Sequence, residues 1–548
     1  MTAVQGDLNR IPHSYQPFSG KIHCMKTAPE TLPDNTETLK NLLLSERAVS
    51  QQKDHYLEQK DNEISQLKQQ YQHMLEQWRL SQDKRFGKSS EVSIDQFALF
   101  NEAEQLDQEM ADEPAVQETV TYTRNKPKRT RLPKDLPRET IVHDIDDADK
   151  ICGDCGHDLH KMGEDKSEQL EFIPAQIKVI EHVRPKYSCR HCEQQGTEVK
   201  IKIAPAPVSA IAKSMATASL LSFIISNKYQ YALPLYRQES LFKQYGITLS
   251  RQTMASWMLK LTPLLNRVYQ HYQKILLQQS FIHADETPLK VINEEKLTSY
   301  MWVYCTGSDS PNIDKDKPCN LVLYDYQASR SGQCARDYLN GYSGYLQVDG
   351  YAGYEKNDAT LVGCWAHARR KFIEAQKTQV KGKTGKADWA INHIKKLYRI
   401  ESEIKQKTAL EKKAARQGQS VVLLNQFKAW LDKSALQVPP KSAIGKAIAY
   451  NLRQWPKLNR YTEEGYLNID NNRAERAVKP FVIGRKNWLF SNTASGAQAS
   501  AMMYSLVETA KANGLIPFDY LRYLLEQLPT NPESIDYLLP WNVVLTKN

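Results

Sequence analysis

The sequence lacks the marks of a membrane or secreted protein. It contains no run of about 18 apolar residues, so no transmembrane helix is expected. The first residues, MTAVQGDLNRIPHSYQ, do not have the basic-then-apolar order of a secretory signal. Cysteine is scarce, and only four of the nine cysteines form close pairs, which argues against a disulfide framework. We therefore expect a cytoplasmic protein with no membrane partner.

What the sequence does have is length and a modest positive charge. At 548 residues it exceeds what one hydrophobic core supports, and roughly 150 residues per domain predicts about three or four units. Lysine and arginine total 73 against 63 acidic residues, a net charge of +10. A clustered excess would favour a polyanionic partner, but the balance alone is weak evidence because many soluble proteins are mildly basic.

The N-terminal part begins with a predicted disordered lead, residues 1–35, and continues with a helical region, residues 36–91. In the helical region apolar residues recur at steps of mostly three or four, the pattern of a coiled-coil seam. The seam consists of Leu57, Ile64, Leu67, Tyr71, Met74 and Trp78. We expect this helix to pair with a copy of itself. The alternative is a helix packed on its own domain, because Lys60 interrupts the seam.

Residues 92–140 are predicted to be a charged linker. An acidic stretch, Glu102–Glu118, is followed by the basic, proline-punctuated stretch NKPKRTRLPKDLPRE. Charge runs of this kind are usually solvated, although a flexible arm of lysines and arginines can also lie along DNA phosphates.

Two CxxC pairs indicate a zinc-binding domain over residues 141–205. The pairs are separated by 33 residues that include strand-like sequence, which predicts a hairpin between them. Their cysteines are Cys152, Cys155, Cys189 and Cys192. Four thiolates at this spacing favour one structural Zn²⁺ with closed tetrahedral coordination over a redox role, and a closed site leaves no position for catalysis.

Residues 206–270 read as a helical, helix-turn-helix-like unit. A short turn at Ile247–Leu249 separates two helical stretches, and Ser250 is a plausible N-cap of the second. Arg251 and Gln252 would then begin a helix in the position from which recognition helices contact DNA. Ordinary helical hairpins have similar sequences, so the pattern leaves a purely structural role open.

After residue 270 the pattern changes to strands. Three extended runs, SFIHADETPLKVI, TSYMWVYCTG and NLVLYDYQ, predict an antiparallel meander, followed by a helix, a short strand in GYLQVDGYAGY and further α/β sequence. The order βββαβ is that of a ribonuclease H-like α/β core, with its first part over residues 271–372. Asp285 falls on the first strand and Asp349 at the end of the fourth, so the two carboxylates can meet at one edge of the sheet.

A third carboxylate is expected on a later helix, in the second part of the core, residues 466–515. Glu475 lies there in a base-rich helical segment, four residues before Lys479 and thus on the same helix face. Three carboxylates suit a pair of Mg²⁺ or Mn²⁺ ions about 4 Å apart, which activate a water or 3′ hydroxyl and stabilise the leaving oxygen at phosphorus. A single Asp or Glu is usually a surface charge, so the inference rests on the ordered trio.

Several neighbouring features are more ambiguous. Residues 373–465 read as a lysine-rich α-helical insertion, and residues 516–548 as a C-terminal helical segment. Cys364 and His367 form a CxxH pair that could bind zinc, but with two ligands in view a structural role at the strand-to-helix junction is favoured. Arg485, Lys486 and Trp488 could line the cleft, the cations against phosphates and the indole against a base, or Trp488 could be a core residue.

A series of motifs makes a resemblance plain. The sequences CGDCGHDL, VRPKYSCRHC, HADETP, GYLQVDGYAGY, GCWAHARRKF, NNRAERAVKPFVIGRKNW and LLPWN are similar to those of the insertion-sequence-66 family of bacterial transposases, over about Leu39 to Trp541. The resemblance implies that Asp285, Asp349 and Glu475 are the family's catalytic DDE carboxylates. RFGKSSE, with Arg85 and Lys88, resembles the N-terminal region for which the family implies binding of DNA ends.

The resulting hypothesis is a multidomain α+β DDE transposase. It would bind the inverted-repeat ends of its own element, free 3′ hydroxyls by hydrolysis and join them to target DNA. Its expected partners are double-stranded DNA, at least one further copy of itself and accessory proteins from the same element, in the bacterial cytoplasm with the nucleoid. The alternatives are a zinc-containing, non-catalytic DNA-binding regulator and a ribonuclease H-like structure-specific nuclease.

Overall fold

The computed structural model describes residues 35–86, 177–187, 202–296, 298–307, 319–379, 384–543 and 545. The chain divides into two units, Met1–Trp78 and Arg79–Asn548. The four predicted zinc cysteines, at positions 152, 155, 189 and 192, lie outside the described residues, as does Lys88, and the side chain of Arg85 is not described. None of the described helices combines the length and apolar character needed to cross a bilayer.

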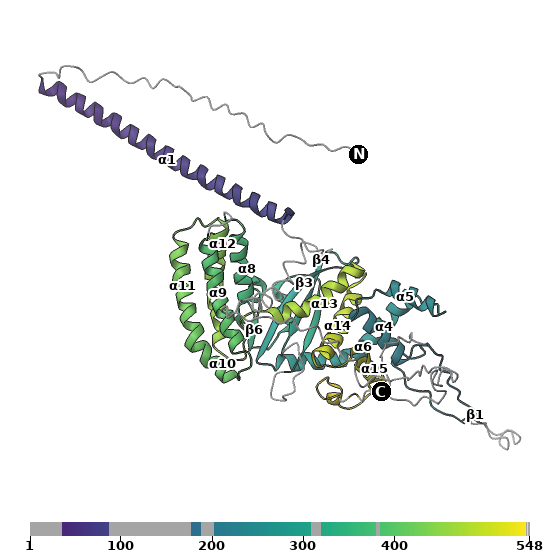
Figure 1. Ribbon diagram of the computed structural model, residues 1–548. Helices are drawn as coiled ribbons and strands as arrows, with labels where there is room; N and C mark the ends of the chain where they lie inside the picture. Colours follow the sequence, from purple (N-terminus) through teal and green to yellow (C-terminus); the bar gives the residue numbers. More distant parts are fainter. Residues whose placement is uncertain are drawn as a thin grey trace, which may run out of the picture. The chain divides into compact units, whose positions relative to one another are not determined.

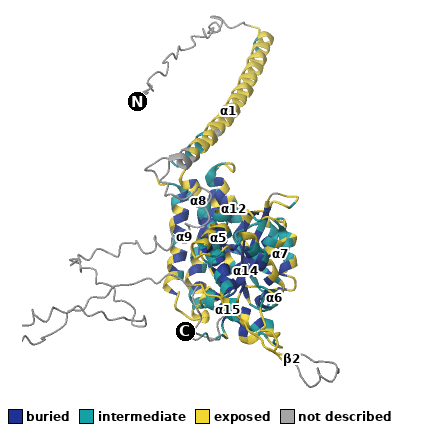
Figure 2. Cartoon of the chain, turned by 90° about the vertical axis from the view of Figure 1, so that its right-hand side faces the viewer, coloured by how far each residue is buried: buried dark blue, intermediate teal, exposed yellow. Residues whose placement is uncertain are grey.

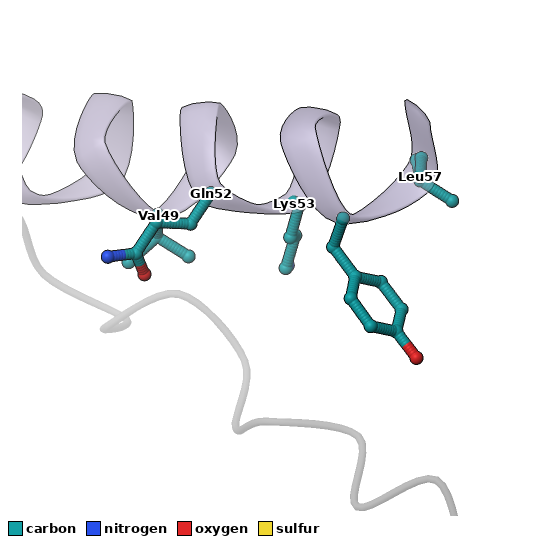
Figure 3. A pocket seen from close by; sticks show the side chains of 5 residues that line it. Val49, Gln52, Lys53 and Leu57 are labelled. Carbon is teal, nitrogen blue, oxygen red and sulfur yellow. The ribbon is translucent and has the colours of Figure 1, made fainter. Parts of the chain in front are cut away.

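One long helix of 51 residues, α1 (Thr36–Phe86), forms the described part of the first unit, and its residues from Arg79 onward belong to the second. The helix predicted for this region is confirmed, and all six residues of the predicted seam are exposed, from Ile64 at 46% to Met74 at 64%. Figure 2 shows α1 exposed along most of its length, and Figure 3 shows Val49 and Lys53 projecting from the same side. Most helical stability in proteins comes from burial of an apolar face, so a second copy of α1 remains the predicted partner.

Near the second cysteine pair, two short strands form an antiparallel ladder. β1 (Lys186–Tyr187) pairs with β2 (Lys202–Ile203). Cys189 and Cys192 belong to the sequence between these two strands. The described ladder therefore brackets the second CxxC pair. Most of the sequence between the two pairs, where a hairpin was predicted, lies outside the described residues.

A mixed five-stranded sheet is the centre of the second unit. Its strand order is β5-β4-β3-β6-β7. The strands are β3 (Phe281–Lys290), β4 (Thr298–Cys305), β5 (Val322–Gln327), β6 (Tyr345–Gln347) and β7 (Thr360–Val362). The predicted meander is confirmed, because β3, β4 and β5 pair antiparallel. On the other side of β3, strands β6 and β7 run parallel to it and to each other.

Helices cover both faces of this sheet (Figure 1). The ones that share its main core are α4 (Ala218–Tyr229), α5 (Leu235–Gln244), α6 (Arg251–Leu277), α7 (Gly332–Tyr338), α13 (Asn472–Trp488), α14 (Ala494–Ala512) and α15 (Pro517–Gln527). α14 also covers the edge of β5, where Ser505 and Thr509 accept hydrogen bonds from the backbone N–H groups of Tyr324 and Val322. An edge strand is protected from further pairing in this way.

The helices predicted over residues 206–270 are confirmed, including the N-cap, because Ser250 Oγ accepts a hydrogen bond from Thr253 N–H. They pack into the core of the sheet, however, and do not have a core of their own. α6 continues to Leu277 and buries Leu265 and Tyr272 completely. The turn and the N-cap in the sequence predicted the start of this helix, but not that its partner is the sheet that follows.

A second core lies beside the sheet and is built from the predicted α-helical insertion. Its residues come mainly from α8 (Trp365–Gln376), α9 (Lys386–Glu403), α11 (Val421–Ala435), α12 (Ala443–Asn459) and η4 (Arg460–Thr462). α10 (Ala409–Ala415) and η3 (Arg416–Ser420) connect α9 to α11. Trp365, Phe427 and Trp430 are among its aromatic side chains. Figure 1 shows these helices gathered on one side of the sheet, with α4, α6 and α14 on the other. Shorter turns are η2 (Ala352–Tyr354), η5 (Leu528–Thr530) and η6 (Asp536–Leu538).

Candidate active site

Two of the predicted carboxylates come from neighbouring parallel strands at the same level. His283 on β3 pairs with Gln347 on β6. Asp285 lies two residues beyond His283, and Asp349 lies two residues beyond Gln347, just past the end of β6. Asp285 is buried and Asp349 half-buried. Parallel strands therefore deliver both residues to one side of the sheet, as the sequence predicted.

The chain turns sharply after Asp349. Its Oδ1 accepts a hydrogen bond from Tyr351 N–H at 2.8 Å, and its carbonyl oxygen accepts one from the hydroxyl of Tyr450 at 2.8 Å. Gly350 has a φ of +97°, and a Cβ there would lie 2.9 Å from the Tyr450 hydroxyl. This position needs glycine both for its backbone conformation and for space, which explains the Asp-Gly pair in QVDGYAGY.

The third carboxylate, Glu475, lies in the first turn of α13 and is buried at 3% exposure. The start of α13 is fixed to β3 by Asn471. The Asn471 Nδ2 group donates to the Ala284 carbonyl at 2.8 Å, and its Oδ1 lies 3.0 Å from His283 Nδ1. Since Oδ1 can only accept, His283 carries its proton on Nδ1, and its Nε2 accepts from the Asn468 amide at 3.0 Å. This network was not predicted, and it holds Glu475 beside Asp285.

The electrostatics show that the three carboxylates influence one another. Burial raises the pKa of Asp285 well above its usual value, and the negative charges of Glu286, Asp349 and Glu475 raise it further. Buried like charges of this kind disfavour the ionised form unless a cation compensates them. The donor set of hard carboxylate oxygens is the type that Mg²⁺ and Mn²⁺ prefer, so the residues present fit a divalent cation.

Glu286, next to Asp285, has a different environment that sequence reasoning missed. Its Oε1 accepts hydrogen bonds from Arg330 Nε at 2.9 Å and Nη2 at 2.6 Å, and its Oε2 accepts one from the Tyr354 hydroxyl at 2.7 Å. The Arg330 guanidinium also lies over the ring of Tyr351, 4.1 Å from its centre. These four residues, the Glu286 clamp, fasten β3 to the turn that follows Asp349.

The CxxH pair lies against Glu475. His367 Nδ1 is 3.4 Å from Cys364 Sγ and 3.5 Å from Glu475 Oε1. Within the described part of the chain, these three are the group of potential ligands whose atoms all lie within 4.8 Å of one another. Asp285, Asp349 and Glu475 do not meet that limit as a trio. Burial, with Arg370, lowers the pKa of His367 to about 4.

The predicted DNA-contact residues have varied surroundings. Arg251 and Gln252 are exposed at the start of α6, Lys486 is exposed and Lys479 is half-buried. Arg485 instead donates to Thr287 Oγ1 at 3.1 Å and to the Pro288 carbonyl, and burial lowers its pKa. Trp488 packs against Tyr504, which supports the core alternative for this indole.

Comparison with known proteins covers most of the chain. Residues 213–499 match the family model described as "Transposase IS66 family". The zinc-finger binding domain of transposase IS66 matches residues 149–193, a model described as "Transposase C of IS166 homeodomain" matches residues 73–141, and the IS66 C-terminal element matches residues 505–541.

Individual relatives also match about three quarters of this chain. The uncharacterized protein y4jD of Sinorhizobium fredii is 33% identical over 75% of this chain and 81% of its own length. The uncharacterized proteins y4hP and y4qI of the same organism are 32% and 33% identical, over 77% and 76% of this chain and 78% and 79% of their own lengths. No solved structure matches the chain significantly. On the family model and these relatives, the chain belongs to the IS66 family of transposases.

Proposed function

We propose that this transposase is a DDE enzyme with a ribonuclease H-like core, in which Asp285, Asp349 and Glu475 hold two Mg²⁺ or Mn²⁺ ions. The strand order β5-β4-β3-β6-β7, with β3 antiparallel to β4 and parallel to β6, supports this core. The observation that carries the proposal is the mutual influence of the carboxylates, seen in the raised pKa of Asp285. Several acids that raise one another's pKa in a buried site favour the binding of a cation.

When bound, the ions would polarise the scissile phosphate and activate the attacking oxygen. The chain's own residues hold the carboxylates in position. His283 and Asn471 join the start of α13 to β3, and the Glu286 clamp joins β3 to the turn after Asp349. These bonds fix three elements that are distant in sequence, which is the positioning that metal-dependent phosphoryl transfer demands.

The substrate we propose is double-stranded DNA carrying the inverted-repeat ends of the element. Hydrolysis of one phosphodiester at each end leaves a 3′ hydroxyl, which then attacks a target phosphodiester and replaces the existing 3′ oxygen at phosphorus. One phosphodiester replaces another, so no nucleotide cofactor is consumed. Arg251, Gln252 and Lys486 are exposed and would contact the DNA backbone. The contacts of the two cations with phosphates would weaken as the salt concentration rises.

One structural Zn²⁺ is proposed for Cys152, Cys155, Cys189 and Cys192, supported by the zinc-finger match over residues 149–193. We also propose that α1 pairs with a copy of itself, supported by its exposed apolar residues. Deletion of residues 36–80 is expected to lower the oligomeric state measured by light scattering. An unchanged mass would remove α1 from the assembly, and accessory proteins from the same element could be sought by co-purification.

The experiment that tests the function is cleavage and strand joining on labelled DNA carrying the element's end, with Mg²⁺ or Mn²⁺. Wild type is compared with Asp285→Asn, Asp349→Asn and Glu475→Gln. Asp358→Asn is the matched control, since Asp358 is an exposed acid nine residues after Asp349. End-specific activity lost in the three variants and kept in the control supports the proposal. Cleavage indifferent to sequence would identify a nuclease, and specific binding with no cleavage by any protein would identify a regulator.

A further inference from the structure

The CxxH pair and Glu475 form a compact cluster whose donors differ in kind from those of the carboxylate site. Cys364 precedes α8 at its N-cap position, and His367 follows in the first turn of that helix. Glu475 comes from the first turn of α13. Cys364 and Glu475 are buried, at 2% and 3% exposure, and the side chain of His367 is 17% exposed. One sulfur, one imidazole nitrogen and one carboxylate oxygen thus converge from two helix starts.

The separations match those of ligands around a single ion. Zinc bonds of about 2.3 Å to sulfur and about 2.0–2.2 Å to nitrogen or oxygen, at a tetrahedral angle, place neighbouring ligand atoms roughly 3.4–3.6 Å apart. The distances from His367 Nδ1 are 3.4 Å to Cys364 Sγ and 3.5 Å to Glu475 Oε1. The third separation lies within 4.8 Å. An ion can therefore enter with little movement of the three ligand side chains.

The surroundings favour a soft or borderline dication. The Asn471 N–H group points at Cys364 Sγ at 3.2 Å, the kind of outer hydrogen bond that supports a metal thiolate. A thiolate and a carboxylate together neutralise the charge of one dication. Thiolate and imidazole select Zn²⁺ or Co²⁺ over Mg²⁺, so this ion differs in class from those proposed for the carboxylate site.

From this geometry we infer that Cys364 Sγ, His367 Nδ1 and Glu475 Oε1 form a zinc-class metal site, with a fourth position left for water. Coordination through Nδ1 leaves the proton on Nε2. The partly exposed Arg370, whose Nη1 is 3.3 Å from Nε2, must then turn its guanidinium away. Glu475 would belong to this site and also to the catalytic set, a consequence that rests on the proposed function. The binding itself does not depend on that function.

The test is the metal content of the purified full-length protein after dialysis against a weak chelator. The ligand variants are Cys364→Ser and His367→Ala, and Cys334→Ser on α7 is the matched control, since Cys334 is another free cysteine. Wild type and control are expected to hold one zinc per chain more than either ligand variant. Zinc in the CxxC pairs is common to all four proteins, so the difference isolates this site.

Cobalt substitution gives a second readout. The thiolate-to-cobalt absorption of the wild type is expected to fall in Cys364→Ser and to remain unchanged in Cys334→Ser. Should Cys364→Ser fail to fold, His367→Ala, altered at a less buried position, decides the question. Equal zinc content in wild type and a folded ligand variant would overturn the inference. Neither measurement involves DNA, so inactivity of the enzyme would overturn the proposed function and leave the metal site standing.

Discussion

The two faces of strand β3 carry adjacent carboxylates in opposite situations. On one face, burial and the charge of Asp349 raise the pKa of Glu286, and hydrogen bonds from Tyr354 and Arg330 oppose that rise. On the other face, burial raises the pKa of Asp285, and the negative charges of Glu286, Asp349 and Glu475 raise it further. Successive residues of a strand point to opposite sides, which allows this separation within two residues. The difference supports a structural role for Glu286 and the proposed cation-binding role for Asp285.

The largest effect is expected for Asp285→Asn, which tests the contrast between Asp285 and Glu286 directly. The amide keeps the shape of the side chain but is a poor metal ligand, so DNA cleavage is expected to fall by about a thousandfold or more. The same change removes a buried charge that three acids repel. In the presence of a chelator, the free energy of unfolding is therefore expected to equal or exceed that of the wild type.

Urea denaturation with a chelator, together with the cleavage assay, measures both effects in one protein. A structural carboxylate would give the reverse result, with lower stability and partial activity. If Asp285→Asn lowered the stability and kept partial activity, Asp285 would be a structural carboxylate like Glu286 and not a metal ligand.

The next largest effect is expected at the joint between the two elements that carry Asp285 and Glu475. Asn471→Ala removes the bonds to Ala284 and His283 while leaving every carboxylate in place. Loss of such supporting bonds typically reduces metal affinity or activity about 10–100-fold. Raised Mg²⁺ should restore part of the rate, as measured by titration of the ion at saturating DNA.

Asn487→Ala is the control for this joint. Asn487 lies in the last turn of the same helix, α13, and its amide donates to the Ala232 carbonyl, whereas Glu475 lies in the first turn. Its substitution is expected to leave the Mg²⁺ dependence unchanged. An equal shift in both variants would indicate general loosening of α13 and not a positioning role for Asn471.

The sequence predicted the elements of this site better than the bonds between them. Apolar alternation indicated β3, β4 and β5, and the order of strands and helices indicated which acids could meet. The Glu286 clamp joins residues 44 and 68 positions apart, and the joint at Asn471 spans 188 positions to His283. No local pattern marks such partners, because each depends on how the sheet and helices pack.

The same limit applies to the CxxH pair. The spacing of Cys364 and His367 was visible, but a third ligand 108 positions beyond His367 was not, so the pair was interpreted as a structural lock. Likewise the N-cap at Ser250 predicted α6 without indicating that the helix would pack into the core of the sheet. Periodicity shows that a face is buried, and only the tertiary fold shows against what.

The clamp face of β3 gives the third prediction. Arg330→Met leaves the buried Glu286 with the Tyr354 hydroxyl as its remaining donor among those described. The free energy of unfolding should fall by about 1–3 kcal/mol, and the partial exposure of Arg330 favours the lower end of that range. Addition of Glu286→Gln in the same chain should recover part of the loss, because the unpaired charge is then gone. Urea midpoints of the two single variants and the double variant measure the coupling, and strict additivity would show that the two residues do not act as a pair.

The smallest effect is expected at Asp325 on β5. It lies between the two cases because its hydrogen-bond partner, Gln327, is neutral and donates to it at 2.8 Å. Burial raises the pKa of Asp325 to about 6, above its ordinary 3.8. A raised carboxyl pKa means that the folded state binds the proton more tightly than the unfolded state does. The contribution of this proton to the free energy of unfolding is therefore complete below about pH 4 and is lost as the pH rises through about 6. Asp325→Asn should remove this part of the pH dependence, about 1–2 kcal/mol after screening, in unfolding curves measured from pH 4 to 7. Identical slopes for variant and wild type would show that Asp325 is as well solvated as an ordinary surface acid.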